Sequence, residues 1–175
     1  ASPISKQARI HGAFLDNAGY IHVIFFGGDD RGAEIFYSRA PAISAGNSQA
    51  WTRPQSIGIN AITPNYAALV GDGDGTLVVV YSSDVDRIGL YAVHSLDGGE
   101  TWSEPDNIFR TFSNQWQPSD LSMHMGKTGR VHVVWNVTDR RGNNVSGYYT
   151  NADVGLWSWL EPVELDTNRE LGIAI

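Results

Sequence analysis

The sequence has no cysteine, few charged residues and no long apolar run. The missing cysteines exclude disulfide bonds, thiolate zinc sites and cysteine nucleophiles. The 12 Lys and Arg residues form no basic cluster, and the 19 Asp and Glu residues bring the formal net charge to −7. Because nucleic-acid ligands require a basic surface, we expect no nucleic-acid partner. No apolar segment reaches the length of a membrane span, so we expect no such span.

The residues that are present favour a β-protein. Hydrophobic residues make up 42% of the 175 residues, enough for a substantial core, whereas only 18% are charged. Helical bundles usually carry many Lys and Glu on their exposed faces, and no segment here shows a 3.6-residue apolar period. Glycine occurs 19 times, which indicates many turns. These features predict an all-β fold.

Two landmarks each recur three times at nearly constant spacing. The first is a glycine followed by an apolar strand, with copies at Gly19, Gly75 and Gly129. The second is the pattern Trp-x-x-Pro, with copies at Trp51, Trp102 and Trp159. The two markers are independent but keep the same order and nearly the same period. The chain is therefore predicted to contain three copies of one structural unit.

Each unit is predicted to contain four short strands. One strand precedes the glycine turn, one follows it, one lies between the landmarks and one follows the Trp-x-x-Pro pattern. The predicted third strands are 34–39, 89–94 and 146–150. Four-stranded sheets that repeat every fifty residues or so are typical of β-propeller blades. The predicted blades are 1–58, 59–110 and 111–165, and 166–175 is predicted to begin a further blade.

One segment of the second unit has a complete sequence motif. Residues 95–102 match Ser-x-Asp-x-Gly-x-Thr-Trp at every defined position, which are Ser95, Asp97, Gly99, Thr101 and Trp102. In such a hairpin the Asp accepts backbone N–H groups, the Gly adopts a positive φ and the Trp anchors the turn to the sheet. We predict a structural role for these residues.

The motif resembles the Asp-box of the BNR/Asp-box repeat proteins, which belong to the sialidase-like superfamily. Degenerate copies end at Trp51 and Trp159, which are predicted to hold equivalent places in their own units. The resemblance implies a β-propeller of four-stranded antiparallel blades, with three blades of a six-bladed propeller present here. The motif is a folding device, so it does not identify a function.

The resemblance also implies two catalytic candidates. Sialidases of this family carry an Arg-Ile-Pro motif in the first strand, and its Arg binds the substrate carboxylate. Arg9 stands in a comparable position, with His11 in place of the proline. The family's general acid/base Asp lies in the loop after the second strand, which implies Asp30. The alternatives are an ordinary charged residue near a strand start and an ordinary polar turn.

The rest of a sialidase site has no match in this sequence. The family's Tyr nucleophile, its Glu partner and two further arginines have no counterparts in matching motifs. Arg110 and Arg140 stand outside such motifs, and Tyr148 is predicted to be a packing residue. We therefore predict a partial sialidase-like propeller that is catalytically incomplete by itself. Its source is predicted to be an exported bacterial protein (secreted, periplasmic or on the cell surface) that binds or hydrolyses glycans. A non-catalytic scaffold that binds protein is the alternative.

Two further patterns are assigned to structure, and no cofactor or metal is expected. The pair Asp72 and Asp74 resembles the start of a calcium loop but lacks the downstream Glu, so we predict a turn. His22 and His132 occupy equivalent positions in two units, which indicates packing.

Propellers close with roughly four to eight blades. Three blades therefore predict either missing blades or self-association of two copies.

Overall fold

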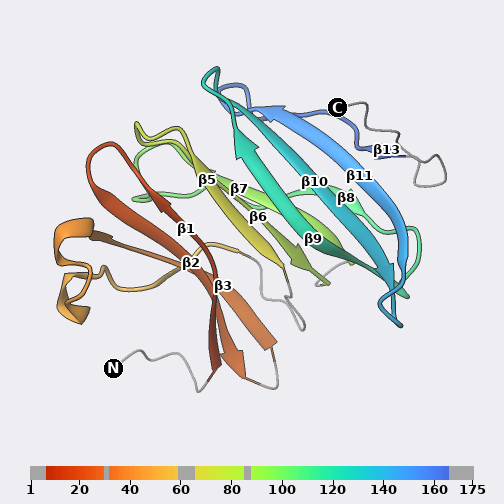
Figure 1. Ribbon diagram of the computed structural model, residues 1–175, viewed down its shortest axis with the longest axis horizontal. Coiled ribbons are helices and arrows are strands. Elements are labelled where there is room, and N and C mark those ends of the chain that lie inside the picture. Colours follow the sequence, from red (N-terminus) through yellow and green to blue (C-terminus); the bar gives the residue numbers. More distant parts are fainter. Residues whose placement is uncertain (1–6, 30–31, 59–65, 85–87, 166–175) are drawn as a thin grey trace, which may run out of the picture.

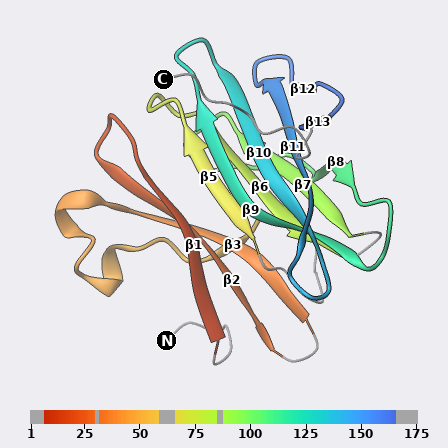
Figure 2. The ribbon, with the colours of Figure 1, turned by 45° about the vertical axis from the view of Figure 1, so that its right-hand side comes forward.

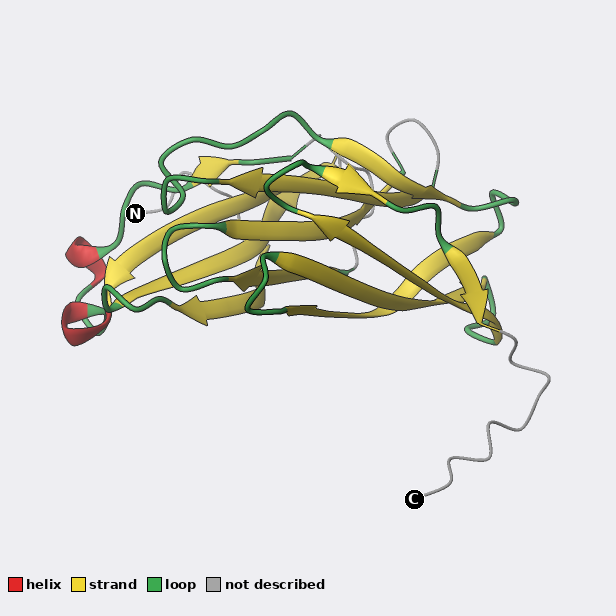
Figure 3. Ribbon diagram, turned by 90° about the horizontal axis from the view of Figure 1, so that it is seen from above, coloured by secondary structure: helices red, strands yellow, loops and turns green. Residues whose placement is uncertain are grey.

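The computed structural model describes residues 7–29, 32–58, 66–84 and 88–165. Within these ranges the chain is all-β, as predicted, apart from two three-residue 3₁₀ turns, η1 (Ala42–Ser44) and η2 (Ser48–Ala50). The strands form three antiparallel sheets that lie face to face as layers (Figure 1). Seen from above, the two helical turns lie at one extremity of the molecule (Figure 3). No helix in the described part of the chain could cross a membrane.

The three sheets follow one another along the chain, and their strands are hydrogen-bonded in sequence order. Sheet 1 contains β1 (Gln7–Leu15), β2 (Tyr20–Asp29), β3 (Gly32–Pro41) and β4 (Gln55–Ser56). Sheet 2 contains β5 (Ala67–Gly71), β6 (Leu77–Ser83), β7 (Gly89–Ser95) and β8 (Asp106–Arg110). Sheet 3 contains β9 (Trp116–Met125), β10 (Arg130–Asp139), β11 (Asn144–Asp153), β12 (Ser158–Trp159) and β13 (Val163–Leu165). The predicted third strands are confirmed as β3, β7 and β11.

The fourth strand differs from the prediction in sheet 3, where it is split. Both β12 and β13 pair with β11, so this sheet has five strands. In every unit the last strand begins directly after the proline of Trp-x-x-Pro, which is Pro54, Pro105 or Pro162. Proline has no N–H to donate, so the ladder resumes only beyond it. In sheet 3 an extra two-residue bridge forms around Trp159, before the proline.

The repeated glycine has a positive φ in all three sheets. Gly19, Gly75 and Gly129 have φ values of 85°, 113° and 75°. Each lies at the turn between the first and second strands of its sheet. The left-handed region is available to glycine with little strain, which explains why this residue marks the repeat. The sequence repeat therefore corresponds to a structural repeat.

The core consists of two apolar layers, one on each face of sheet 2. All seven residues of β6 are buried, because sheets 1 and 3 cover it on both sides. By contrast, β2 and β10 alternate between buried and partly exposed residues: Ile24 is fully buried, whereas Val134 is 42% exposed. Among the second strands, burial on both faces is therefore confined to β6 of the middle sheet.

The first strands of the three sheets lie side by side along one edge of the molecule. β1 lies beside β5, and β5 beside β9 (Figure 2). Gly12 explains how closely β1 approaches β5, because a Cβ at this position would stand 3.3 Å from the Leu69 backbone nitrogen. The last strands lie at the opposite edge of each sheet. This arrangement brings residues from different repeats together on the surface formed by β1, β5 and β9, which we call the edge of first strands.

Candidate functional site

The complete Asp-box forms a closed network of hydrogen bonds in the β7–β8 connection. The Asp97 carboxylate accepts the Ser95 hydroxyl at 2.7 Å, the Thr101 N–H at 2.9 Å and the Thr101 hydroxyl at 2.5 Å. The Ser95 Oγ in turn accepts the Gly99 N–H at 2.8 Å. Gly99 has φ +89°, as its place in the motif requires. The local geometry is that of a self-contained turn.

The same hairpin fastens sheet 2 to sheet 1. The Tyr37 hydroxyl and an Arg39 guanidinium N–H both donate to the Gly98 carbonyl, at 3.0 and 2.5 Å, and Arg39 also pairs with Glu100. The Trp102 ring stands edge-on to Tyr37, with ring centroids 5.0 Å apart. We call Tyr37 and Arg39 the receptor on β3. The motif alone does not indicate this receptor, because both residues lie about sixty residues earlier in the chain.

The flanking copies of the motif are attached differently. The Trp51 Nε1 donates to the Ala45 carbonyl of its own loop, at 2.9 Å. In sheet 3, the loop contacts sheet 2 through Trp157. The ring centroids of Trp157 and His94 are 3.9 Å apart, and the Trp157 Nε1 donates to the Asp106 carboxylate of β8. Trp159 stands edge-on to Trp157. The sequence therefore identified Trp159 but missed the residue that makes the contact between sheets.

A buried histidine supports the receptor on β3. His22 is 1% exposed and contacts the Tyr37 hydroxyl through Nδ1 at 2.7 Å and the Asp16 carboxylate through Nε2 at 3.1 Å. Burial raises the pKa of Tyr37 far above its usual range. Burial opposes ionisation of Asp16, but hydrogen bonds from the Tyr20 N–H and His22 outweigh it and lower the pKa of Asp16. A phenol that resists ionisation is suited to hold a hydrogen bond. Because His22 is buried and holds this phenol in place, its position agrees with the packing role predicted for it.

The Asp97 carboxyl predicts a specific dependence of stability on pH. Hydrogen bonds from the Thr101 hydroxyl and then from its N–H lower the pKa of Asp97 from 3.8 to about 2. A carboxyl with a depressed folded-state pKa stabilises the fold above its unfolded pKa, and this contribution is lost as the pH falls from about 4 to 2. We expect Asp97→Asn to remove that part of the acid-induced loss, measured by urea unfolding from pH 5 to pH 2. If the free energy of unfolding fell equally with pH in both proteins, this role of Asp97 would be contradicted.

The edge of first strands carries two equivalent irregularities. The pairing of β1 with β2 shifts at His11, and the pairing of β9 with β10 shifts at Asp120 and Leu121. In each case the first strand has one extra residue opposite the same position of the repeat, Phe25 or Trp135. β-bulges redirect side chains and are frequent next to binding sites. No sequence signal marks either bulge.

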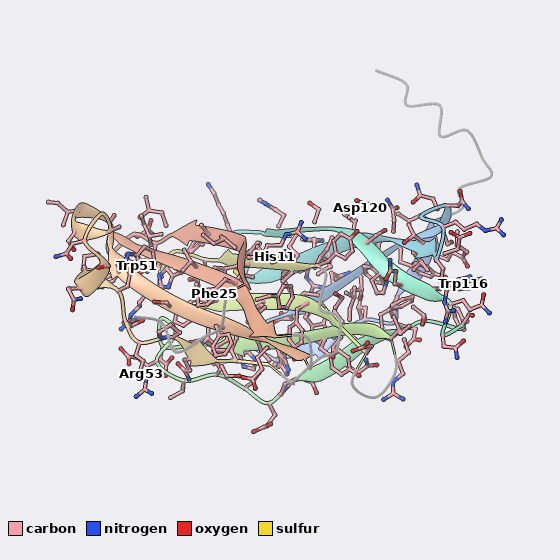
Figure 4. All side chains as sticks on the ribbon, turned by 90° about the horizontal axis from the view of Figure 1, so that it is seen from below. His11, Phe25, Trp51, Arg53, Trp116 and Asp120 are labelled. Atoms are coloured by element: carbon pink, nitrogen blue, oxygen red, sulfur yellow. The ribbon has the colours of Figure 1, made fainter. Side chains whose placement is uncertain are left out.

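Asp120 combines exposure with a strained backbone. Its φ is +48°, one of two positive values at non-glycine residues in the described ranges. Its carboxylate accepts the Ser119 hydroxyl at 3.2 Å and the Asn136 side-chain amide at 3.1 Å. Strain of this kind concentrates at functional sites. Figure 4 shows Asp120 and His11 along the same long side of the molecule.

Arg9 and His11 lie together at the start of β1. Arg9 is exposed and pairs with Phe26 across the ladder, and the His11 ring stands edge-on to Phe26 at 4.5 Å. Burial, and then the charge of Arg9, lower the pKa of His11, so the imidazole is neutral near neutral pH. The His11 Nε2 is buried and has no hydrogen-bond partner among the described residues. Asp30, the other catalytic candidate, lies outside the described residues.

The remaining candidates from the sequence lie in a last strand and in turns. Arg110 ends β8 and donates to Asn107 at 2.9 Å, and Arg140 is exposed in the turn between β10 and β11. The Asp72 carboxylate accepts the N–H groups of Asp74 and Thr76 at 2.8 and 3.0 Å, which is the geometry of a turn. The described residues contain no cluster of His, Asp and Glu that could hold a metal ion.

No protein-family model and no curated protein sequence matches the chain. Solved structures with a similar fold include a polysaccharide lyase (10% identity, TM-score 0.57) and a PL25 ulvan lyase described as a new polysaccharide lyase family (13%, 0.54). A third is a PL25 ulvan lyase bound to glucuronic acid joined 1-4 to 3-sulfated rhamnose (14%, 0.55). The matches cover 86%, 87% and 87% of this chain but only 39%, 40% and 40% of the solved chains. The chain therefore spans about 40% of their length, and the likeness concerns the fold.

Proposed function

We propose that the three sheets are blades of a sialidase-like Asp-box β-propeller, with blades 1–58, 59–110 and 111–165. The face-to-face stacking of the sheets supports this proposal, as does the alignment of β1, β5 and β9 along one edge. So does the attachment of each later sheet to the preceding one through the loop that ends at its repeat tryptophan. In propellers, first strands converge on the axis, where ligands bind.

On this basis, the chain contributes part of the ligand-binding surface of a glycan-directed protein, and the ligand is an acidic polysaccharide. The proposal rests on the two equivalent bulges, which place His11 and Asp120 on the edge of first strands. Arg9, which is exposed, lies beside His11. A guanidinium suits a uronate or sialate carboxylate, and a neutral imidazole can accept a proton. The fold shared with polysaccharide lyases supports a polysaccharide over a protein ligand. Such a ligand fits a secreted, periplasmic or cell-surface location.

The test is binding of the chain to a polysaccharide of glucuronic acid and sulfated rhamnose, measured by affinity electrophoresis and calorimetry. We expect retardation by this polymer and none by a neutral glucan. Arg9→Ala should weaken binding by about tenfold, the loss of one charge-assisted contact. The matched control is Arg53→Ala, because Arg53 is exposed but lies on the other side of the molecule (Figure 4). Equal retardation by the neutral glucan, or equal losses in both variants, would contradict the proposal.

A sialic-acid polymer in the same experiment separates the two acidic ligand classes. Preferential binding of that polymer would favour the sialidase-like candidate pair Arg9 and Asp30. Preferential binding of the glucuronate polymer would favour the ligand class of the solved lyase complex. Failure of both polymers would favour the alternative of a protein-binding scaffold.

A further inference from the structure

The outer face of sheet 3, which points away from sheet 2, exposes apolar side chains. Val134, Tyr149 and Val163 are aligned across β10, β11 and β13, and Leu165 lies beside them on the same face. The exposed fractions of Val134, Val163 and Leu165 are 42%, 58% and 42%. The alternate residues of β10, such as Val133, are buried against sheet 2. We call this surface the Tyr149 face.

The contacts between neighbouring sheets follow one pattern. In sheets 2 and 3, the loop before the last strand binds the third strand of the preceding sheet. In the first junction Gly98 and Glu100 bind Tyr37 and Arg39 of β3. In the second junction a loop tryptophan stacks on His94 of β7. His94 is the counterpart of Arg39, since each is paired with the equivalent residue of the second strand.

The Tyr149 face repeats the receptor of the first junction. Tyr149 and Asn151 occupy the positions of Tyr37 and Arg39 in the repeat. His132 contacts the Tyr149 hydroxyl at 2.9 Å, as His22 contacts that of Tyr37 at 2.7 Å. The Asn151 side chain donates to the same hydroxyl, so the receptor is held in place by hydrogen bonds. No loop of the described residues is shown bound to it.

Sheet 1 presents the complementary surface. It has a loop equivalent to the Asp-box (42–51), but no earlier sheet among the described residues receives this loop. Its outer face carries Ile10, which is 71% exposed, next to the stacked rings of Phe25 and Phe36. Figure 4 shows Phe25 on β2. Sheet 2 covers the receptor on the third strand of sheet 1. In the order of the repeat, a copy of sheet 1 placed after sheet 3 would cover the Tyr149 face in the same way.

We propose that the Tyr149 face binds sheet 1 of a second copy of this chain. The loop 42–51 of that copy lies over Tyr149 and Asn151, and the faces that carry Val134 and Ile10 bury each other. The contact is heterologous, because two different surfaces meet. Two such contacts close a ring of six sheets, a number within the range of propellers.

The first measurement is sedimentation velocity of the intact chain at tens of micromolar. The expected species is a dimer of about 38 kDa, twice the 19.1 kDa of the monomer. A monomer with a native near-UV circular dichroism spectrum would overturn the proposal. This outcome is independent of glycan binding, which tests the proposed function separately.

The second measurement identifies the two surfaces. Val134→Lys and Ile10→Lys place a charge on each face at positions exposed enough to accept it, and each variant alone is expected to be monomeric. Mixing them restores one intact contact, between the Tyr149 face of the Ile10→Lys chain and sheet 1 of the other, so heterodimers should form. The control Phe112→Lys changes an 81% exposed apolar residue outside the sheets and should remain dimeric. Dimers of both single variants, or no recovery on mixing, would overturn the proposal.

Discussion

Gly99→Ala is expected to lower the free energy of unfolding by about 3 kcal/mol, from strain at a positive φ and from overpacking. A Cβ at this position would stand 2.1 Å from the Tyr37 hydroxyl oxygen and 2.3 Å from its ring carbon. The ring would have to move, and with it the hydrogen bonds from Tyr37 to the Gly98 carbonyl and to His22. Urea unfolding monitored by tryptophan fluorescence measures the loss.

Two other glycines separate the contributions to this effect. Gly129 has φ +75°, but a Cβ added there would meet no atom within 4 Å, so Gly129→Ala should show the strain alone, about 1 kcal/mol. Gly46, in the degenerate first motif, has neither strain nor neighbours, and Gly46→Ala should change stability by less than about 0.5 kcal/mol. If Gly99→Ala cost no more than Gly129→Ala, the close contact with Tyr37 would be wrong.

Trp102→Ala is expected to cost about 2–3 kcal/mol, because it removes a large ring from the apolar layer between sheets 1 and 2. The loss includes the edge-on contact with Tyr37. Since the Tyr37 ring would lose its support, we also expect faster hydrogen exchange at the β7–β8 hairpin. Equilibrium unfolding and hydrogen exchange measure the two effects.

Trp51→Ala is the matched control, since Trp51 holds the same place in the first unit. Its indole donates to Ala45 of its own loop and belongs to neither apolar layer, so we expect a loss of about 1 kcal/mol or less. Equal losses for the two tryptophans would show that Trp102 stabilises its own hairpin and does not fasten the sheets. In the proposed dimer, Trp51→Ala should additionally weaken association.

The repeat landmarks show most clearly what local sequence can predict. The glycines, the tryptophans and the prolines predicted where strands turn and begin, because these residues act on their own stretch of backbone. A glycine permits a positive φ, and a proline interrupts a ladder, whatever surrounds them. The hydrogen bonds of the Asp-box were predictable for the same reason, since donor and acceptor lie within six residues of each other.

The candidate site was predictable only in part. Arg9 was found through its resemblance to a sialidase motif, and the structure places it exposed on the first strand. The contribution of Asp120 was missed, because no sequence signal marks an Asp as the residue that adopts a positive φ in a bulge. In the sequence His11 is a departure from the family motif, whereas the structure makes it a bulge residue beside Arg9. Bulges depend on the register with the neighbouring strand, which local sequence does not specify.

By itself, the sequence determined that this protein is built from three similar β-units with fixed turns, because turn chemistry and strand patterning are local. The tertiary structure alone decided which faces are buried and which residues fasten one unit to the next. Tyr37 and Arg39 become a receptor only when a hairpin sixty residues later is brought against them. The Tyr149 face is exposed because sheet 3 is covered on one side only, and burial of this kind depends on the neighbour and not on the strand itself.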